Sequence, residues 1–122
     1  MRRRALLAAS GSSGEVDWSY ELHLTPEWVD DPFSNGEEAE IYGDFSELHA
    51  LMVRMVETLG KRTEHDNGYT YELYGFPPEF NFTVDGARID YCVKLSIYND
   101  ITFDCGSITG TLYTDYIYLS KY

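Results

Sequence analysis

Histidine and cysteine are the residue types of this chain best suited to metal binding or nucleophilic chemistry, and both are scarce. The histidines are His23, His49 and His65, and the cysteines are Cys92 and Cys105. Zinc sites place their ligands in short pairs, about two to five residues apart. No histidine stands at such a spacing from a cysteine. The sequence therefore predicts no metal site.

Carboxylates crowd residues 30–40, DDPFSNGEEAE, which raises the question of calcium binding. An EF-hand loop needs an oxygen ligand at its third position and a glutamate at its twelfth. Counted from Asp31, those positions hold Phe33 and Tyr42, so the EF-hand pattern fails. We favour a solvated loop, and an irregular oxygen cage stays open as the alternative. The ligands of that cage would be Asp30, Asp31, Asn35 and Glu37.

Two glycine-containing stretches match catalytic or nucleotide-binding motifs only in part. In residues 106–110, GSITG, the position that holds serine in a G-x-S-x-G nucleophile motif is Ile108. Gly60-Lys61 lacks the upstream glycine of a phosphate-binding loop. We therefore expect a protein that is not an enzyme and that uses no cofactor.

Tyrosine is abundant, with eleven residues in the chain. Its ring offers a large contact area at low entropic cost, and tyrosine is enriched in protein interfaces. It also has a high strand propensity, so half-exposed tyrosines on a sheet are ordinary. Both interpretations stay open at this point. Enrichment in interfaces predicts a protein-binding face, whereas strand propensity alone predicts an ordinary sheet surface. The tyrosines expected opposite the apolar face are Tyr42, Tyr74, Tyr98, Tyr116 and Tyr118.

One helix is expected over residues 44–60, DFSELHALMVRMVETLG. Asp44 is a suitable N-cap with Glu47 three residues later, and Gly60 is a suitable stop. Apolar residues recur every three or four positions, which predicts one buried stripe. The stripe consists of Phe45, Leu48, Leu51, Met52, Met55 and Leu59.

Alternation of apolar and polar residues predicts the strands. They cover residues 16–24, 38–42, 69–74, 78–84, 87–97, 101–105 and 111–120, and residues 62–68 form a polar link. Asp85-Gly86 predicts a two-residue hairpin turn that pairs Val84 with Ala87. In the 87–97 strand, Tyr91 is expected on the apolar face, and Tyr113 shares the apolar face of the last strand.

The length of the turn between the 87–97 and 101–105 strands can be predicted from the requirement that their apolar side chains share one face of the sheet. A three-residue loop over 98–100 keeps the apolar face intact and pairs Ile97 with Ile101 and Val93 with Cys105. Cys105 then lies on the core face and Cys92 on the opposite one, which excludes a disulfide between them. Free thiols are typical of the cytoplasm.

These elements predict an α+β fold, a mostly antiparallel twisted sheet of about six or seven strands with the helix packed across one face. A length of 122 residues fits one domain, which we place at residues 15–122. Residues 1–14 form a basic arm with a Gly/Ser joint.

The charge is divided unevenly between the arm and the domain. Three of the nine basic residues are Arg2, Arg3 and Arg4, which leaves six basic against twenty-one acidic residues in the domain, a charge of −15. Phosphate binding needs clustered basic residues, so the domain is not expected to bind nucleic acid. No apolar run is long enough to cross a membrane.

The arm, MRRRALLAASGSSG, starts like a secretory signal but does not continue as one. The apolar part, residues 5–9, is mostly alanine and shorter than the roughly seven residues that a signal peptide needs. We therefore expect no secretion by a signal peptide. Together with the free thiols, this predicts a cytoplasmic location.

The stretch MRRRALLAAS followed by a Gly/Ser joint resembles the start of many small uncharacterised proteins of phages and prophages of gut bacteria. Some of these proteins are virion components. The resemblance covers about fourteen residues and carries over no catalytic or binding residue. It implies a phage origin and a structural role, with a location in the cytoplasm of the producing bacterial cell or in the virion.

Two hypotheses follow. The first is a non-enzymatic structural or assembly protein of a phage particle, which contacts a protein partner or further copies of itself. Its contacts would be the five tyrosines above and, in the arm, Arg2, Arg3, Arg4, Leu6 and Leu7. The alternative is an acidic inhibitor, a nucleic-acid mimic or immunity protein, that blocks a basic site on an enzyme.

Overall fold

The computed structural model describes residues 17–25 and 38–122, and these residues form one helix and ten strands. The helix is α1 (Ser46–Leu59). The strands are β2 (Tyr20–Leu24), β3 (Glu38–Tyr42), β4 (Lys61–His65), β5 (Gly68–Leu73), β6 (Phe80–Val84), β7 (Ala87–Arg88), β8 (Cys92–Leu95), β9 (Ile101–Asp104), β10 (Ile108–Leu112) and β11 (Tyr116–Lys121). The predicted α+β class is confirmed.

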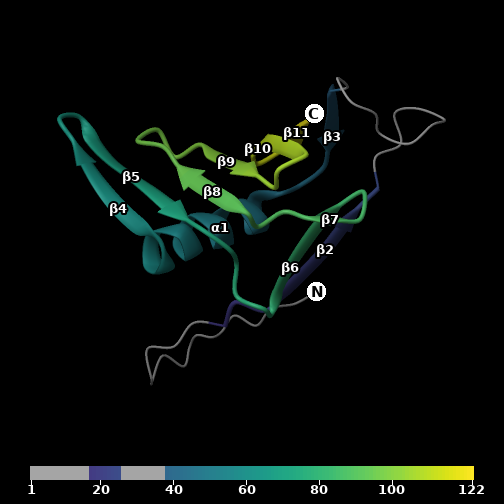
Figure 1. Cartoon of the computed structure of the whole chain (residues 1–122), viewed down its shortest axis with the longest axis horizontal. Coiled ribbons are helices and arrows are strands. Elements are labelled where there is room, and N and C mark those ends of the chain that lie inside the picture. The colour runs from purple at the N-terminus through teal and green to yellow at the C-terminus, as the bar shows by residue number, and fades with distance from the viewer. Residues whose placement is uncertain (1–16, 26–37) are drawn as a thin grey trace.

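The strands form two sheets (Figure 1). The large sheet has seven antiparallel strands in the order β3-β11-β10-β9-β8-β5-β4, and α1 lies along one of its faces. The small sheet has the order β2-β6-β7, with β2 parallel to β6. The seven-stranded antiparallel sheet agrees with the prediction. The separate small sheet does not, because the sequence analysis placed all strands in one sheet.

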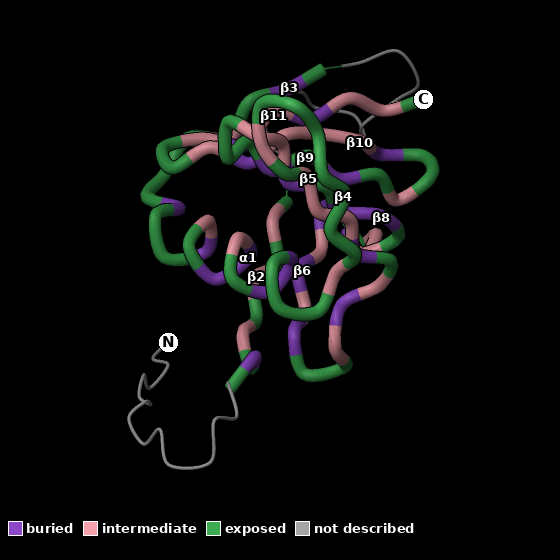
Figure 2. Tube along the Cα trace, turned by 90° about the vertical axis from the view of Figure 1, so that its left-hand side faces the viewer, coloured by how far each residue is buried: buried purple, intermediate pink, exposed green. Residues whose placement is uncertain are grey.

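One core joins the helix and both sheets. The helix buries Leu48, Met52 and Met55 completely against the large sheet. The small sheet contributes Phe80 and Phe82, which are also fully buried, and Phe82 meets Phe103 of β9 edge to face at 6.0 Å between ring centroids. Figure 2 shows the buried positions gathered where these elements face one another. The opposite face of the large sheet takes no part in this core.

The helix begins and ends close to the predicted positions, but for different physical reasons. The N-cap is Phe45, and the carboxylate of Asp44 accepts a hydrogen bond from the Ser46 N–H at 3.2 Å. Gly60 has an extended backbone, so it is not a left-handed stop. A side chain at Gly60 would collide with the carbonyl oxygens of Val56 and Glu72.

The apolar stripe of the helix is correct except at its last position. Leu59 is 46% exposed, and Val56 is buried in its place. The chain turns at Gly60 straight into β4, so the last helical residue lies beyond the apolar surface that the rest of the stripe covers.

Residues 62–68 are not a link, and that prediction was wrong. They contain most of β4 and a two-residue turn, Asp66-Asn67, that leads into β5. All five residues of β4 are exposed, so no apolar alternation marks this strand in the sequence.

The predicted strand over residues 87–97 is interrupted. The Asp85-Gly86 turn pairs Val84 with Ala87 as predicted, but the chain then leaves the small sheet after β7 and enters the large sheet at β8. The bend between the two sheets leaves Tyr91 64% exposed, so its predicted place on the apolar face was wrong. Arg88 stabilises the segment that connects the two sheets, because its guanidinium donates to the carbonyl of Phe80 at 2.8 Å and pairs with Asp90.

The loop between β8 and β9 spans residues 96–100 and is longer than the predicted three residues. Leu95 therefore pairs with Ile101, and Val93 with Phe103. The Ser96 hydroxyl accepts hydrogen bonds from the backbone N–H of Tyr98 and of Asp100, which stabilises the wider loop. A register shift of two residues keeps every side chain on its predicted face.

The predicted strand over residues 111–120 is a hairpin. β10 ends at Leu112, which pairs with Ile117 of β11, and the chain turns between them through residues 113–116. The Tyr113 N–H donates to the Tyr116 carbonyl at 2.9 Å across this turn. Ile117 and Leu119 face the core as predicted, but Tyr113 belongs to the turn.

Candidate functional site: the open face of the large sheet

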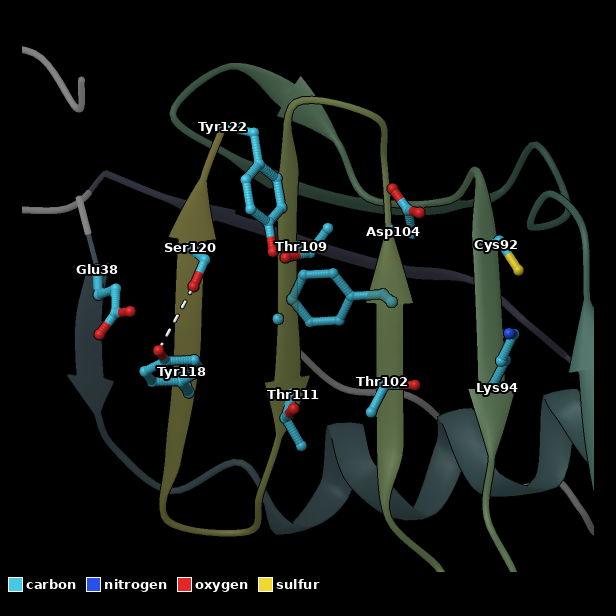
Figure 3. A pocket seen from close by; sticks show the side chains of 12 residues that line it. Glu38, Cys92, Lys94, Thr102, Asp104, Thr109, Thr111, Tyr118, Ser120 and Tyr122 are labelled. Atoms are coloured by element: carbon cyan, nitrogen blue, oxygen red, sulfur yellow. Dashed lines mark hydrogen bonds between the residues drawn. The ribbon is translucent and has the colours of Figure 1, made fainter. Parts of the chain in front are cut away.

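The open face is the side of the large sheet that faces away from α1. Apart from Cys92, its side chains are half-buried or exposed. Strand alternation builds this face from the residues that lie between the core positions. It is hollowed over β11, β10, β9 and β8, with a cavity volume of about 580 Å³ (Figure 3). The lining residues are Glu38, Cys92, Lys94, Thr102, Phe103, Asp104, Thr109, Gly110, Thr111, Tyr118, Ser120 and Tyr122.

Three tyrosines form a stack at one end of the open face. Tyr116 lies between Tyr113 and Tyr42, with ring centroids 4.5 Å and 5.3 Å away, and both pairs are stacked. Burial raises the pKa of Tyr116, and the nearby Tyr113 adds to the shift. The hydrogen bond that the Tyr42 hydroxyl donates to Glu40 raises the pKa of Tyr42. The raised pKa values favour the protonated phenols of Tyr42 and Tyr116, and the stack offers flat ring surfaces.

Short hydroxyl side chains and two further tyrosines form the hollow beside the stack (Figure 3). The Ser120 hydroxyl donates to the Tyr118 hydroxyl at 3.4 Å. The chain end is held in place because the Tyr122 N–H donates to the Ser107 carbonyl at 2.8 Å. Thr109 and Thr111 of β10 lie between these groups and β9. The hydroxyl groups of this part of the face can form hydrogen bonds, and Glu38 and Asp104 add carboxylates at its margins.

A carboxylate organises the other end of the open face. Glu72 accepts hydrogen bonds from the Tyr74 hydroxyl at 2.8 Å and from the Cys92 thiol at 3.4 Å, and its oxygen lies 3.8 Å from the Lys94 ammonium. The bond from Tyr74 is the main reason that the pKa of Glu72 is lowered. The same bond raises the pKa of Tyr74 to about 12.

Neither thiol has the properties of a nucleophile. Burial raises the pKa of Cys92, and the hydrogen bond to Glu72 raises it further. Burial also raises the pKa of Cys105, whose thiol donates to the Ile108 carbonyl at 3.0 Å. Both cysteines are free, as predicted. A reactive cysteine needs a lowered pKa, so the open face offers no activated thiol.

The structure brings three of the five predicted contact tyrosines together, since Tyr42, Tyr116 and Tyr118 lie on neighbouring strands β3 and β11. Tyr74 lies at the far end, directly after β5. Tyr98 lies in the 96–100 loop, 76% exposed, and is not on the sheet face. The arm residues Arg2, Arg3, Arg4, Leu6 and Leu7 lie outside the described residues, so their predicted role stays a prediction.

The sequence analysis missed Tyr113 and the group around Glu72. Tyr113 was assigned to the apolar face because the hairpin turn was not recognised. The group around Glu72 joins β5 and β8, which are neighbours only because of the sheet order. Glu72 pairs with Lys94, and the correct register of these two strands would have revealed it.

Among residues 17–25 and 38–122, no three histidine, cysteine or acidic side chains are grouped so that they could hold a metal ion. His23 contacts Glu21 and Thr83 at 2.7 Å each, and His65 contacts Thr70 at 2.9 Å. The alternative oxygen cage at residues 30–37 lies outside the described residues. The helix of the described part is too short to span a bilayer.

No family model, no curated protein and no solved structure matches this chain. Any functional conclusion therefore depends on the geometry of the open face and on the distribution of charge along the sequence.

Proposed function

We propose that this protein is a non-enzymatic structural or assembly protein that acts through protein–protein contacts, with the open face of the large sheet as its contact surface. The stack of Tyr42, Tyr113 and Tyr116 carries the proposal, because it places three stacked rings on a sheet face that no other described helix or strand covers. Aromatic side chains of this kind are the usual anchors of protein interfaces.

The chemistry of the hollow supports binding over catalysis. Its hydroxyl groups can form hydrogen bonds. The thiol of Cys92 donates to the neighbouring carboxylate of Glu72, which also accepts from Tyr74, and the pKa of this thiol is raised. Catalysis needs an activated nucleophile or an acid and base of matched pKa. The raised pKa of the Cys92 thiol and the lowered pKa of the Glu72 carboxyl are shifted away from such roles, which supports binding as the function of the open face.

The partner that fits this face is basic, and the arm of a neighbouring copy has the required chemistry. Glu38, Glu40 and Asp104 lie on the open face with Lys94 as the basic residue among its lining side chains. An arginine can pair with these carboxylates and also lie over a tyrosine ring. Arg2, Arg3 and Arg4 supply three such groups, and Leu6 and Leu7 supply apolar contact.

The resemblance of the opening stretch supports a role in a phage particle. A location in the bacterial cytoplasm or in the virion belongs to the same proposal. An acidic inhibitor would gather its carboxylates on one surface to imitate nucleic acid. Among the described residues, acidic side chains lie in α1, in the turns and on the open face, so we rank the inhibitor second.

Light scattering on the full chain after size-exclusion chromatography tests the proposal. We expect wild-type protein to form assemblies that added salt weakens, because screening reduces the attraction between arm and face. Tyr116→Ser removes the middle ring of the stack and should abolish these assemblies, whereas Tyr116→Phe should retain them. Replacing Arg2, Arg3 and Arg4 by serine should have the same effect as Tyr116→Ser.

Tyr91→Ser is the matched control, because Tyr91 is an exposed tyrosine outside the hollow. It should assemble like wild-type protein. The proposal is overturned if Tyr91→Ser and Tyr116→Ser behave alike, or if the arm variant assembles as wild-type protein does.

A further inference from the structure

Strand β4 forms one edge of the large sheet, and no strand of the described part of the chain pairs with its outer side (Figure 1). Its sequence is KRTEH, and every residue in it is exposed. An unpaired edge offers backbone donors and acceptors to any other strand, so natural proteins protect edges or use them. The arrangement of charges along β4 indicates which of the two applies here.

The register of the β4–β5 hairpin shows which backbone groups are free to pair. The strands are joined by the two-residue turn Asp66-Asn67, so His65 and Gly68 form a hydrogen-bonded pair. Hydrogen-bonded and non-hydrogen-bonded pairs alternate along an antiparallel ladder. Thr63 therefore directs its backbone groups toward β5, and Arg62 and Glu64 direct theirs outward.

We propose that β4 pairs antiparallel with β4 of a second copy of this chain, about a two-fold axis through Thr63. In this register Arg62 lies opposite Glu64 of the second copy, and Glu64 lies opposite the second copy's Arg62. Both are hydrogen-bonded pairs, so the outward backbone groups of the two edges are satisfied by each other. Oppositely charged cross-strand pairs stabilise a sheet.

The neighbouring registers are disfavoured. An axis through Arg62 places the two Arg62 side chains opposite each other, and an axis through Glu64 does the same with two glutamates. Like charges directly opposite are destabilising. A register shifted by one residue would place Arg62, whose backbone groups point away from β5, opposite Thr63, whose backbone groups already bond to β5. The two edges could then form no continuous ladder of hydrogen bonds. The strand therefore complements itself in a single register.

The side chains beside β4 add contact area to the pairing. Arg62 and Glu64 lie 3.3 Å apart on the side of the sheet that bears α1, and the Arg62 guanidinium lies 3.7 Å from the centre of the Tyr69 ring. Tyr69 is 44% exposed, and the half-exposed Leu59 lies just before β4. These groups are preformed next to the edge, so pairing needs little rearrangement.

A cysteine on the two-fold axis tests the pairing directly. Thr63 would face its counterpart as a non-hydrogen-bonded pair, with Cα atoms about 4.5 Å apart. A disulfide spans Cα distances of about 4.4–6.8 Å. We expect mild oxidation of full-length Thr63→Cys to give a covalent dimer on a non-reducing gel, which wild-type protein with Cys92 and Cys105 does not give.

Lys61→Cys is the matched control on the same strand. Lys61 would lie opposite His65 of the second copy, which leaves the two copies of residue 61 about 13 Å apart along the ladder. This distance is too long for a disulfide. Equal crosslinking of Lys61→Cys and Thr63→Cys would overturn the proposed register.

A charge exchange provides the second test. The masses are compared in a Tyr116→Ser background, which lacks the proposed association of arm and open face. There, Arg62→Glu and Glu64→Arg each place like charges opposite one another and should reduce the mass in solution from a dimer of the 14.0 kDa chain to a monomer. The double variant restores opposite charges and should restore the dimer. A wild-type protein that stays monomeric at high concentration, or a double variant that stays monomeric, overturns the proposal.

This inference does not depend on the proposed function, because β4 and the tyrosine stack lie at opposite ends of the large sheet. Tyr116→Ser should leave the Thr63→Cys crosslink intact. Arg62→Glu should leave the association of arm and open face intact. Failure of one contact is therefore distinguishable from failure of the other.

Discussion

The two faces of the large sheet are built from the same strands but differ in burial and in chemistry. Along β11, Ile117 and Leu119 are fully buried against the core, and Tyr116 and Tyr118 alternate with them on the open face. Along β8, Val93 and Leu95 face the core and Lys94 faces outward. One face is apolar and close-packed, and the other holds rings, hydroxyl groups and charges.

Under the proposed function, the inner face provides stability and the open face provides binding. Burial of apolar area is the main stabilising contribution to a fold, so the inner face should dominate the free energy of unfolding. The open face contributes cross-strand contacts such as the stack around Tyr116, which are individually small. Substitutions there should alter association while the fold persists.

The largest expected effect is at Ile117 on the inner face, compared with its neighbour Tyr118 on the open face. Ile117→Ala removes buried atoms and leaves a cavity, which should lower the free energy of unfolding by about 2–5 kcal/mol. Tyr118→Thr keeps a strand-forming residue on the open face and should cost under about 1 kcal/mol. Urea denaturation measures both. Equal losses would mean that the open face is part of the core.

Gly110 should show an intermediate effect, because a side chain there would meet both the backbone of β11 and a core ring of β9. A Cβ there would collide with the Tyr118 carbonyl oxygen and would lie 2.7 Å from the Phe103 ring. Gly110→Ala should therefore destabilise the fold by about 1–3 kcal/mol, as overpacking does. The same urea titration measures the loss.

Gly43→Ala is the control for this substitution, since the nearest atoms to its added Cβ belong to the Phe45 ring at 3.2 Å. A ring edge can shift where a backbone carbonyl cannot. If both alanine variants unfold at the same urea concentration, the close approach of β10 and β11 does not constrain the sheet.

The sequence was sufficient to predict the class of the fold, the helix and the direction of most core side chains. Those features depend on local periodicity, and β9 shows why they are robust. Its register was misplaced by two residues, yet Ile101 and Phe103 still face the core, because alternation has a period of two.

The features that the sequence did not predict depend on relations between distant segments. The exposed edge strand β4 carries no apolar alternation. The division of residues 87–97 between two sheets depends on which strands each part pairs with. Arg88 of β7 stabilises the crossing by bonding to the Phe80 carbonyl of β6 and to Asp90. The group around Glu72 needs β5 beside β8, which local pattern does not specify.

The smallest expected effect is a pH dependence at the Glu72 end of the open face. The pKa of Tyr74 is raised from 10.0 to about 12, mainly by its hydrogen bond to Glu72. A raised pKa in the folded state favours the protonated phenol, so this contribution to stability is complete below pH 10 and is lost as the pH rises toward 12. Because Tyr74 is 68% exposed, solvent screens the interaction and the effect should be modest.

The urea midpoint of wild-type protein should therefore fall more between pH 9 and pH 11 than that of Tyr74→Phe, which has no phenol to ionise. Ultraviolet titration gives the same comparison without denaturation. In Glu72→Gln one tyrosine should ionise at a lower pH than in wild-type protein, because the amide replaces the carboxylate that holds the phenolic proton. Identical titrations for wild-type protein and Glu72→Gln would show that the two side chains do not interact in solution. In that case the Glu72 end of the open face would be free to bind a partner's basic group, and the tyrosine stack would no longer be the better anchor.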